Sequence, residues 1–356
     1  MATVGIDLGT TNSLVSVWQD DKCTLIPNNL GEYLTPSVVG IDENGEMLVG
    51  RTAKERLISH PENTVASFKR FMGTEKTFML GNRRFTAADL SSMVLRQLKE
   101  DAEKYLGEPV EEAVISVPAY FNDFQRNATK MAGELAGLTV ERLVNEPSAA
   151  ALAYRFGKAK EDQTFLVFDF GGGTTDFDFG IWRKASGPKE RRYRYVIHHF
   201  GDGGDAYLGG ENLLELLAFE VFKANSSVLR KSKITFPLPP QCQHFGGDEV
   251  LISESQEAWT NMRHMMECLR PFWERQEGYE KLFETGVMKL RLFDSSGTKL
   301  ENFELAVDTK ILESTLRKRI TEGVESFFDA LFSLIHGKYG EELKDIKMVH
   351  IFLAGN

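Results

Sequence analysis

A short motif that occurs twice limits the possible folds of this chain more than any other feature. The sequence DLGTTN starts at Asp7 after an apolar segment, and DFGGGTTD starts at Asp169 after another. Each turn leads into residues that alternate between apolar and polar, as in half-buried strands. Repetition of one strand–turn–strand unit predicts two similar lobes that face one another.

Strands and helices alternate between and after the two hairpins, which is typical of an α/β protein. The clearest helix is expected over 87–106, with Thr86 as its N-cap and Gly107 at its end. Asn44-Gly45 indicates a β-hairpin in a small polar subdomain. The other expected elements are strands at 23–26, 113–117, 139–143 and 346–353, and helices at 123–136, 147–154 and 256–274, although Pro271 lies inside the last of these.

The repeat also sets the expected domain boundaries. The polar segment 157–163 separates two halves, so lobe I is expected to cover 1–158 and lobe II 159–356. Outer subdomains are expected at about 35–88 and about 205–305. Because the chain ends on a strand followed by a turn sequence, we expect it to be truncated at its C-terminus.

The charge balance argues against a general nucleic-acid binder. The 356 residues include 42 Lys+Arg and 52 Asp+Glu, a net charge of −10, whereas a phosphate backbone requires a basic surface. The three cysteines lack disulfide or metal-binding spacing, which is typical of a reducing compartment. Because the chain has neither a secretory signal pattern at its start nor a run of about 18 apolar residues, we expect a soluble, cytoplasmic protein without a membrane partner.

Both copies of the motif combine residue types that suit a polyphosphate with a metal ion. Glycines allow the backbone to approach phosphate closely, and successive N–H groups then point at its oxygens. Threonine hydroxyls add donors, and Asp7 and Asp169 are expected to hold Mg²⁺. A single Asp-x-Gly-Thr is more typical of an ordinary hairpin turn, but two copies in the same context favour a nucleotide site. The sequence has no Gly-x-x-x-x-Gly-Lys-Ser/Thr, so it does not predict a P-loop.

Five segments in order are similar to signatures of the DnaK-type 70-kDa heat-shock chaperones. They are 6–13 (IDLGTTNS), 117–126 (VPAYFNDFQR), 145–151 (NEPSAAA), 168–174 (FDFGGGT) and 204–211 (GDAYLGGE). The resemblance implies an actin-like ATPase fold, in which two duplicated lobes surround a nucleotide cleft. Each lobe would contain a mixed five-stranded sheet with helices. The chain would then be the nucleotide-binding domain of such a chaperone.

The resemblance also implies roles for individual residues. Lys69 resembles the lysine that positions the attacking water, although a lysine by itself is usually a surface charge. Glu146 and Asp176 resemble acids that order this water and the metal, and which of them takes the proton stays open. The implied catalytic residues are Lys69, Glu146, Asp169 and Asp176; the implied nucleotide ligands are Gly9, Thr10, Thr11, Asn12, Gly171, Gly172, Gly173, Thr174, Thr175, Gly209, Gly210, Glu211, Glu267, Arg270 and Gly355; the implied metal ligands are Asp7 and Asp169.

A relay and several partners follow from the resemblance alone. Pro118, Asp123 and Arg126 resemble residues that report the nucleotide state to a peptide-binding domain. Without the resemblance they would be a strand end, a helix cap and a surface charge. The implied cofactors are ATP or ADP and Mg²⁺, with K⁺ as a further candidate. The implied partners are a J-domain co-chaperone, a nucleotide-exchange factor and client peptides, which a domain outside this chain would bind.

The second half departs from the family pattern where adenosine is expected to bind. The family's Glu, Lys, Arg and Ser align best with Glu267, Arg270, Pro271 and Glu274. Proline cannot stack on a base as arginine does, so weaker or different adenine binding is expected. Further departures are Asn212 in place of an acid, and Ala354-Gly355-Asn356 in place of Gly-Gly-Ser.

Three functions remain open from the sequence. The first is an ATPase module of a chaperone, in which slow hydrolysis controls conformation. The second is a nucleotide-binding interaction module that hardly hydrolyses ATP. The third is a small-molecule kinase, since sugar kinases share actin-like lobes, although no sugar site is evident in the sequence.

Two pairs of potential metal ligands stand outside these motifs. They are His198-His199 and Cys242-x-His244. Neither pair has a further Cys or His at the spacing of a metal site, so we do not expect either pair to bind a metal ion.

Overall fold

The computed structural model describes residues 2–155, 163–186, 188–190, 195–337, 339–344 and 349–355. The chain divides into two compact units, which we describe separately. Unit 1 comprises 1–206 together with 325–356, and unit 2 comprises 207–324. The expected lobe boundary at 158 lies outside the described residues, so the two-lobe division stays a prediction.

The first sheet of unit 1 contains the N-terminal hairpin. Its order is β11-β10-β1-β2-β3, and β4 also pairs with β2. β1 is antiparallel to β2 and parallel to β10, so the meander continues into a parallel portion. The bounds are β1 Ala2–Asp7, β2 Asn12–Gln19, β3 Lys22–Ile26, β4 Thr35–Pro36, β10 Val110–Val117 and β11 Thr139–Asn145. The strands expected in this half are confirmed.

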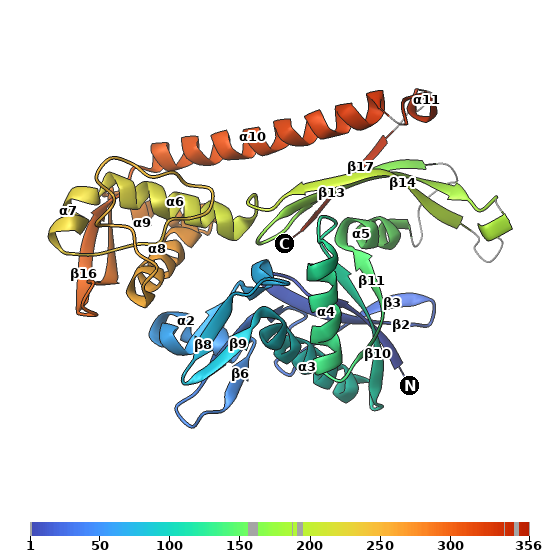
Figure 1. Ribbon diagram of the computed structural model, residues 1–356, viewed down its shortest axis with the longest axis horizontal. Coiled ribbons are helices and arrows are strands. Elements are labelled where there is room, and N and C mark those ends of the chain that lie inside the picture. The colour runs from blue at the N-terminus through green and yellow to red at the C-terminus, as the bar shows by residue number, and fades with distance from the viewer. Residues whose placement is uncertain are drawn as a thin grey trace. The chain divides into compact units, whose positions relative to one another are not determined.

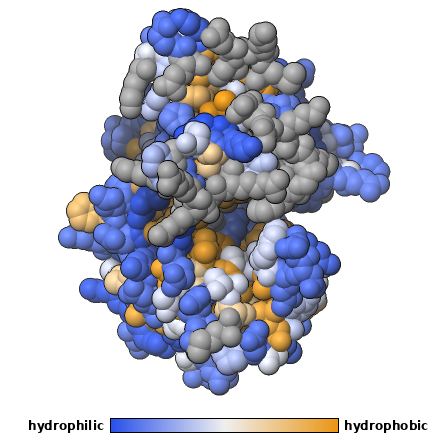
Figure 2. All heavy atoms as spheres, turned by 90° about the vertical axis from the view of Figure 1, so that its right-hand side faces the viewer, coloured by the Kyte–Doolittle hydropathy of each residue, from blue (hydrophilic) through white to orange (hydrophobic). Residues whose placement is uncertain are grey.

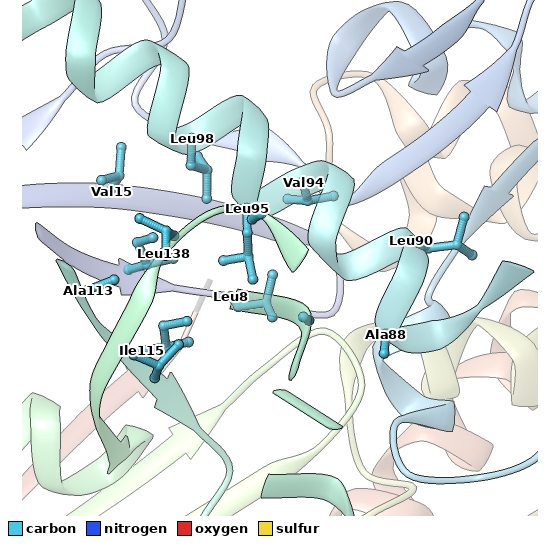
Figure 3. Packing of buried hydrophobic residues seen from close by; sticks show 14 of the residues in the cluster. Leu8, Val15, Ala88, Leu90, Val94, Leu95, Leu98, Ala113, Ile115 and Leu138 are labelled. Carbon is cyan, nitrogen blue, oxygen red and sulfur yellow. The ribbon is translucent and has the colours of Figure 1, made fainter. Parts of the chain in front are cut away.

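Helices α3 (Ala87–Leu106), α4 (Asp123–Leu135) and α5 (Glu146–Arg155) pack in unit 1 (Figure 1). At the start of α3, the Thr86 side chain accepts the Asp89 N–H, and the Asp89 side chain accepts the Thr86 N–H. Gly107 ends the helix with φ 71°. The apolar side of α3 packs on the sheet: Leu95 and Leu98 lie near Val15 and Leu138 (Figure 3). This core fixes the strand ends that carry the candidate site.

A small subdomain of short elements precedes α3. The expected hairpin at Asn44-Gly45 is confirmed, because it joins two antiparallel strands, and Asp42 accepts the N–H groups of Asn44 and Glu46. The bounds are β5 Val38–Ile41, β6 Met47–Val49, β7 Thr64–Ala66, β8 Thr77–Leu80, β9 Arg83–Thr86, α1 Arg51–Lys54, α2 Arg56–Ser59, and 3₁₀ turns η1 Pro61–Asn63 and η2 Phe68–Phe71. The turn η2 brings Lys69 into the interior.

The second sheet of unit 1 repeats the local topology of the first. Its order is β14-β13-β12-β17, and β12 lies between antiparallel β13 and parallel β17, as β1 lies between β2 and β10. The bounds are β12 Gln163–Phe170, β13 Thr175–Lys184, β14 Tyr195–Asp205 and β17 Val349–Gly355, with η3 Pro188–Glu190 and α11 Gly340–Leu343 nearby in sequence. The described part of this sheet has four strands, where the resemblance implied five. The duplication predicted from the repeated motif is therefore confirmed for the arrangement of strands around β1 and β12.

Unit 2 has its own apolar core, built from helices and one hairpin. Its elements are α6 Gly210–Ala224, α7 Ser226–Lys231, α8 Gln256–Trp273, α9 Tyr279–Phe283, β15 Val287–Phe293 and β16 Lys299–Ala306. The long helix α10 (Thr309–His336) begins in unit 2 and ends in unit 1, where Phe327 packs on Phe168 and Phe177. Helix α8 continues past Pro271, which lies in its last turn.

Hydrophilic residues predominate in the coloured parts of the face drawn in Figure 2, with hydrophobic patches between them. Individual large apolar side chains are nevertheless exposed in the described part of the chain, among them Phe124 and Leu353. No helix in the described ranges is long and apolar enough to cross a membrane.

Candidate functional site

The first motif forms a tight turn between β1 and β2. A Cβ on Gly9 would lie 2.0 Å from the carbonyl oxygen of Asn12, so only glycine fits here. The Gly9 N–H donates to Ser13 Oγ at 3.1 Å, and Ser37 Oγ donates to the Gly9 carbonyl oxygen at 2.7 Å. Ser13 and Ser37 also bond one another. The turn is therefore held in one shape by two buried hydroxyls.

The turn of the second motif lies directly against the first. A Cβ added to Gly172 would lie 1.9 Å from Thr11 Oγ1, and one added to Gly173 would lie 3.1 Å from Thr10 Oγ1. Thr11 Oγ1 is buried without a hydrogen-bond partner among the described residues. The structure thus brings the glycines of one motif to the threonines of the other, which the repeat alone did not specify.

The aspartates that open the two motifs lie at the ends of β1 and β12. Asp7 accepts a 2.7 Å hydrogen bond from Ser116 Oγ on the neighbouring parallel strand. Burial, and then repulsion from Asp7, raise the pKa of Asp169 from its usual 3.8 to about 6. The two carboxylates therefore interact electrostatically, as ligands of one cation would.

Asp176 faces Asp169 across the β12–β13 hairpin. Its side chain is 1% exposed, and Oδ2 accepts a 3.3 Å hydrogen bond from Thr174 Oγ1. The other oxygen, Oδ1, has no hydrogen-bond partner among the described residues. Burial, and then repulsion from Asp169, raise the pKa of Asp176 to about 7. A buried acid with one unused oxygen is suited to take a proton or orient a ligand.

Lys69 and Glu146 form a buried ion pair near these acids. Lys69 Nζ donates to Glu146 Oε1 at 2.7 Å, and the two side chains are 5% and 16% exposed. Lys69 Nζ also lies 5.6 Å from the centre of the Phe121 ring. Burial raises the pKa of Glu146 to about 7, although the charge of Lys69 opposes the shift. Charges on Asp7 and Asp176 contribute to this increase, so all these groups lie in one electrostatic environment.

Sequence reasoning missed two side chains that complete this site. Ser116 binds Asp7, and the pairing of strands β1 and β10 could have pointed to it. Tyr120 lies within the 117–126 signature, and burial together with the charge of Asp176 raises the pKa of its hydroxyl. Both side chains join the site through contacts between segments that are far apart in the sequence.

The proposed relay residues lie at the end of β10 and the start of α4. Arg126 donates to the Phe121 carbonyl oxygen at 2.8 Å and to Asn145 Oδ1 at 2.8 Å. Arg126 is thus more than a surface charge, since it joins α4 to the end of β11, next to Glu146. The helix-cap interpretation of Asp123 was wrong, because the cap is Asn122, whose side chain accepts the Gln125 N–H.

The candidates in unit 2 form a separate charged cluster. Arg270 binds Glu211 through two bonds of 2.8 and 3.1 Å, and binds Glu267 at 2.7 Å. Gly209 is the N-cap of α6, which starts at Gly210. The guanidinium of Arg270 is therefore fully engaged by carboxylates of its own unit.

The last predicted ligand, Gly355, ends β17 in unit 1. Its φ of 112° favours glycine, and a Cβ there would lie 1.9 Å from the Phe170 carbonyl oxygen. Gly355 therefore packs tightly beside the end of β12, and its contact with a nucleotide stays a prediction.

The geometry of unit 1 defines a class of protein: a nucleotide-binding domain of the actin-like type, with two duplicated hairpins. A comparison with protein families matches the Hsp70 protein family over residues 3–80 and 75–213. The chain belongs to the Hsp70 family, as the five segments indicated, and the actin-like fold class is confirmed. Members of this family generally bind ATP or ADP with Mg²⁺.

Proposed function

We propose that this domain binds ATP with Mg²⁺ and hydrolyses it slowly, and that the nucleotide state controls client binding by a domain outside this sequence. The observation that carries the proposal is the buried Lys69–Glu146 pair, which shares its environment with Asp7 and Asp176. A buried charged pair has little value for stability alone, and perturbed acids cluster at functional sites.

The two touching turns supply the phosphate site in this proposal. The N–H group of Gly172 and the hydroxyl of Thr11 would donate to phosphate oxygens, and Gly9 and Gly171 would let the backbone approach them closely. Thr11 Oγ1 supports this role because it is buried without a partner among the described residues. Each turn is already shaped by internal bonds, such as Gly171 N–H to the Thr174 carbonyl oxygen at 2.8 Å. Donors held on turns that are already shaped in this way stabilise phosphoryl charge.

The acids fit a magnesium ion that is shared with the nucleotide. Among the described residues, no three Asp, Glu, His or Cys side chains gather closely enough to hold a metal ion by themselves. Mg²⁺ commonly uses one or two carboxylates together with phosphate and water, and Asp7 and Asp169 would provide them. The raised pKa of Asp169 supports this fit, because a cation would remove its repulsion with Asp7. When bound, the ion would neutralise phosphate charge.

Lys69, Glu146 and Asp176 would act on the attacking water. Asp176 Oδ1 has no hydrogen-bond partner in the described part of the chain, and the pKa of Asp176 is about 7, which suits a group that accepts the proton of the water near neutral pH. Glu146 uses Oε1 to bind Lys69, so we assign it the task of orienting that lysine. The ammonium of Lys69 would stabilise the charge that develops on the transferred phosphoryl group.

Partners of the domain follow from family membership. A J-domain co-chaperone, a nucleotide-exchange factor and client peptides are the proposed partners, and Arg126 is proposed to pass the nucleotide state from the end of β11 to α4. The function of ATP hydrolysis would then be to change the conformation of the protein, and the rate of ATP turnover would matter less.

Steady-state phosphate release with purified protein and MgATP tests the proposal. We expect slow release that Asp176→Asn abolishes while calorimetric ATP binding persists. Binding without release in the unmodified protein would favour the second candidate, a nucleotide-binding interaction module. ATP consumption only after a sugar is added would favour a kinase and overturn the chaperone assignment.

A further inference from the structure

A second buried acid lies behind the candidate catalytic residues. Asp178 is on β13, two residues after Asp176, and it is 1% exposed. Its Oδ2 accepts a 2.7 Å hydrogen bond from Ser148 Oγ, and its Oδ1 lies 2.9 Å from His199 Nδ1. No step of the proposed mechanism uses Asp178, Ser148 or His199.

These bonds join three elements of unit 1. Ser148 is on α5, two residues after Glu146, and His199 is on β14. The Ser148–Asp178 bond therefore ties the helix that carries Glu146 to the strand that carries Asp176. A buried carboxylate is strongly unfavourable unless its oxygens receive hydrogen bonds, so the bond to His199 helps to keep Asp178 in this place.

The setting of His199 favours a donor at Nδ1. The carboxylate of Asp178 accepts, so the Nδ1 atom must carry the proton. The charges that act on His199 are Asp178 on β13 and Asp202 on β14, and Arg126 on α4 acts on Asp202. The hydrogen bond to Asp178 raises the pKa of His199, which agrees with a donor held by an acid. The side chain is 43% exposed, so it can be replaced without opening the core.

We propose that His199 is a positioning residue, which acts through Asp178 and Ser148 to hold Glu146 and Asp176 at their working separation. The inference rests on the proposed hydrolysis but concerns residues that the proposed mechanism places in contact with neither the nucleotide nor the attacking water. Without the donor of His199, the buried carboxylate of Asp178 would lose one of its two hydrogen bonds and turn toward solvent. The first turn of α5 would then lose its tie to β13.

The test compares three variants by single-turnover hydrolysis, ATP affinity and hydrogen–deuterium exchange of residues 146–152. His199→Ala removes the donor, and His199→Asn restores an N–H close to the position of Nδ1. His244→Ala is the matched control, because His244 makes a similar 3.0 Å contact with buried Asp248 in unit 2. We expect His199→Ala to slow hydrolysis about tenfold with unchanged ATP affinity, since small displacements of catalytic groups reduce rates strongly.

The outcomes separate this inference from the proposed function. Faster exchange at 146–152 in His199→Ala, but not in His199→Asn or His244→Ala, supports the positioning role even if the unmodified protein does not hydrolyse ATP. The positioning role would be overturned if His199→Ala left both the exchange at 146–152 and the hydrolysis rate unchanged. It would also be overturned if His199→Asn slowed hydrolysis as much as His199→Ala does. Absence of hydrolysis in the unmodified protein would overturn only the proposed ATPase activity.

Discussion

Lys69 Nζ donates a 2.7 Å hydrogen bond to Glu146 Oε1, although the two residues lie 77 positions apart in the chain. The 3₁₀ turn η2 carries one partner, and the first turn of α5 carries the other. Both side chains are largely removed from water. The pair therefore links the fold of the small subdomain to the chemistry proposed at the ends of the strands.

Lys69→Ala should abolish phosphate release and destabilise the protein. Removal of one partner leaves the other buried and uncompensated, which typically costs about 3–5 kcal/mol of unfolding free energy. Loss of a charge that stabilises the transition state should lower the hydrolysis rate at least about a hundredfold. Urea unfolding and a phosphate-release assay measure the two effects. Lys99→Ala is the control, because its 3.7 Å pair with Glu103 is more exposed and should contribute no more than about 1 kcal/mol.

Asp176→Asn should change how stability depends on pH. Burial and Asp169 raise the pKa of Asp176 from 3.8 to about 7, so the folded state binds this proton more tightly than the unfolded state. The stability that protonated Asp176 contributes is full below about pH 4 and is lost as the pH rises to about 7. Asparagine has no such titration. The variant should therefore unfold at a higher temperature than the unmodified protein at about pH 8, and this advantage should disappear at about pH 4.

Asp294→Asn serves as a control of opposite sign. Hydrogen bonds from Ser296 and Thr298 lower the pKa of Asp294, so its charged form stabilises the folded state above the ordinary pKa. Its replacement should lower the unfolding temperature at about pH 8. Equal behaviour of the Asp176 and Asp294 variants across this range would contradict the electrostatic description of the site.

Local patterns in the sequence predicted most elements of unit 1. The Thr86 cap and Gly107 end of α3 are where the residue types placed them, because capping depends on a few neighbouring atoms. The repeated motif predicted two hairpins with equivalent neighbours, which β12 and β1 have. Such features are encoded within a few residues.

Contacts between distant segments could not be predicted in this way. The sequence around Lys69 does not indicate that its side chain is buried, because its partner Glu146 comes from another element. Likewise, nothing in the sequence links Ser148 to Asp178 or His199. Family resemblance suggested a role for Lys69, but it could not supply the contacts of Asp178 and His199, which lie outside the family signatures.

Gly172→Ala should weaken nucleotide binding. The new methyl group would lie 1.9 Å from Thr11 Oγ1, so one of the two turns must move. Since both turns are proposed to hold phosphate, MgATP affinity should fall about tenfold or more, equivalent to at least about 1.4 kcal/mol. Isothermal calorimetry measures the change. Gly246→Ala is the control, because a Cβ there meets no atom within 4 Å. Equal affinity in both variants would argue against a shared phosphate site.

Pro271→Arg should tighten ATP binding if α8 contacts the base as the family resemblance predicts. Arg270 cannot substitute as a stacking partner, because Glu211 and Glu267 already bind its guanidinium. A free arginine over an aromatic base contributes about 1–2 kcal/mol, or roughly fivefold to thirtyfold in affinity.

Pro271→Ala separates stacking from helix repair in this test. Both substitutions restore an N–H within α8, and both should stabilise unit 2, since a proline inside a helix removes a backbone hydrogen bond. Only the arginine can stack. Titration with ATP and with inorganic tripolyphosphate should show tighter ATP binding in Pro271→Arg alone and unchanged tripolyphosphate binding in both variants. A gain for tripolyphosphate in Pro271→Arg would show that the added charge acts on phosphate, and the predicted contact of α8 with adenine would be wrong.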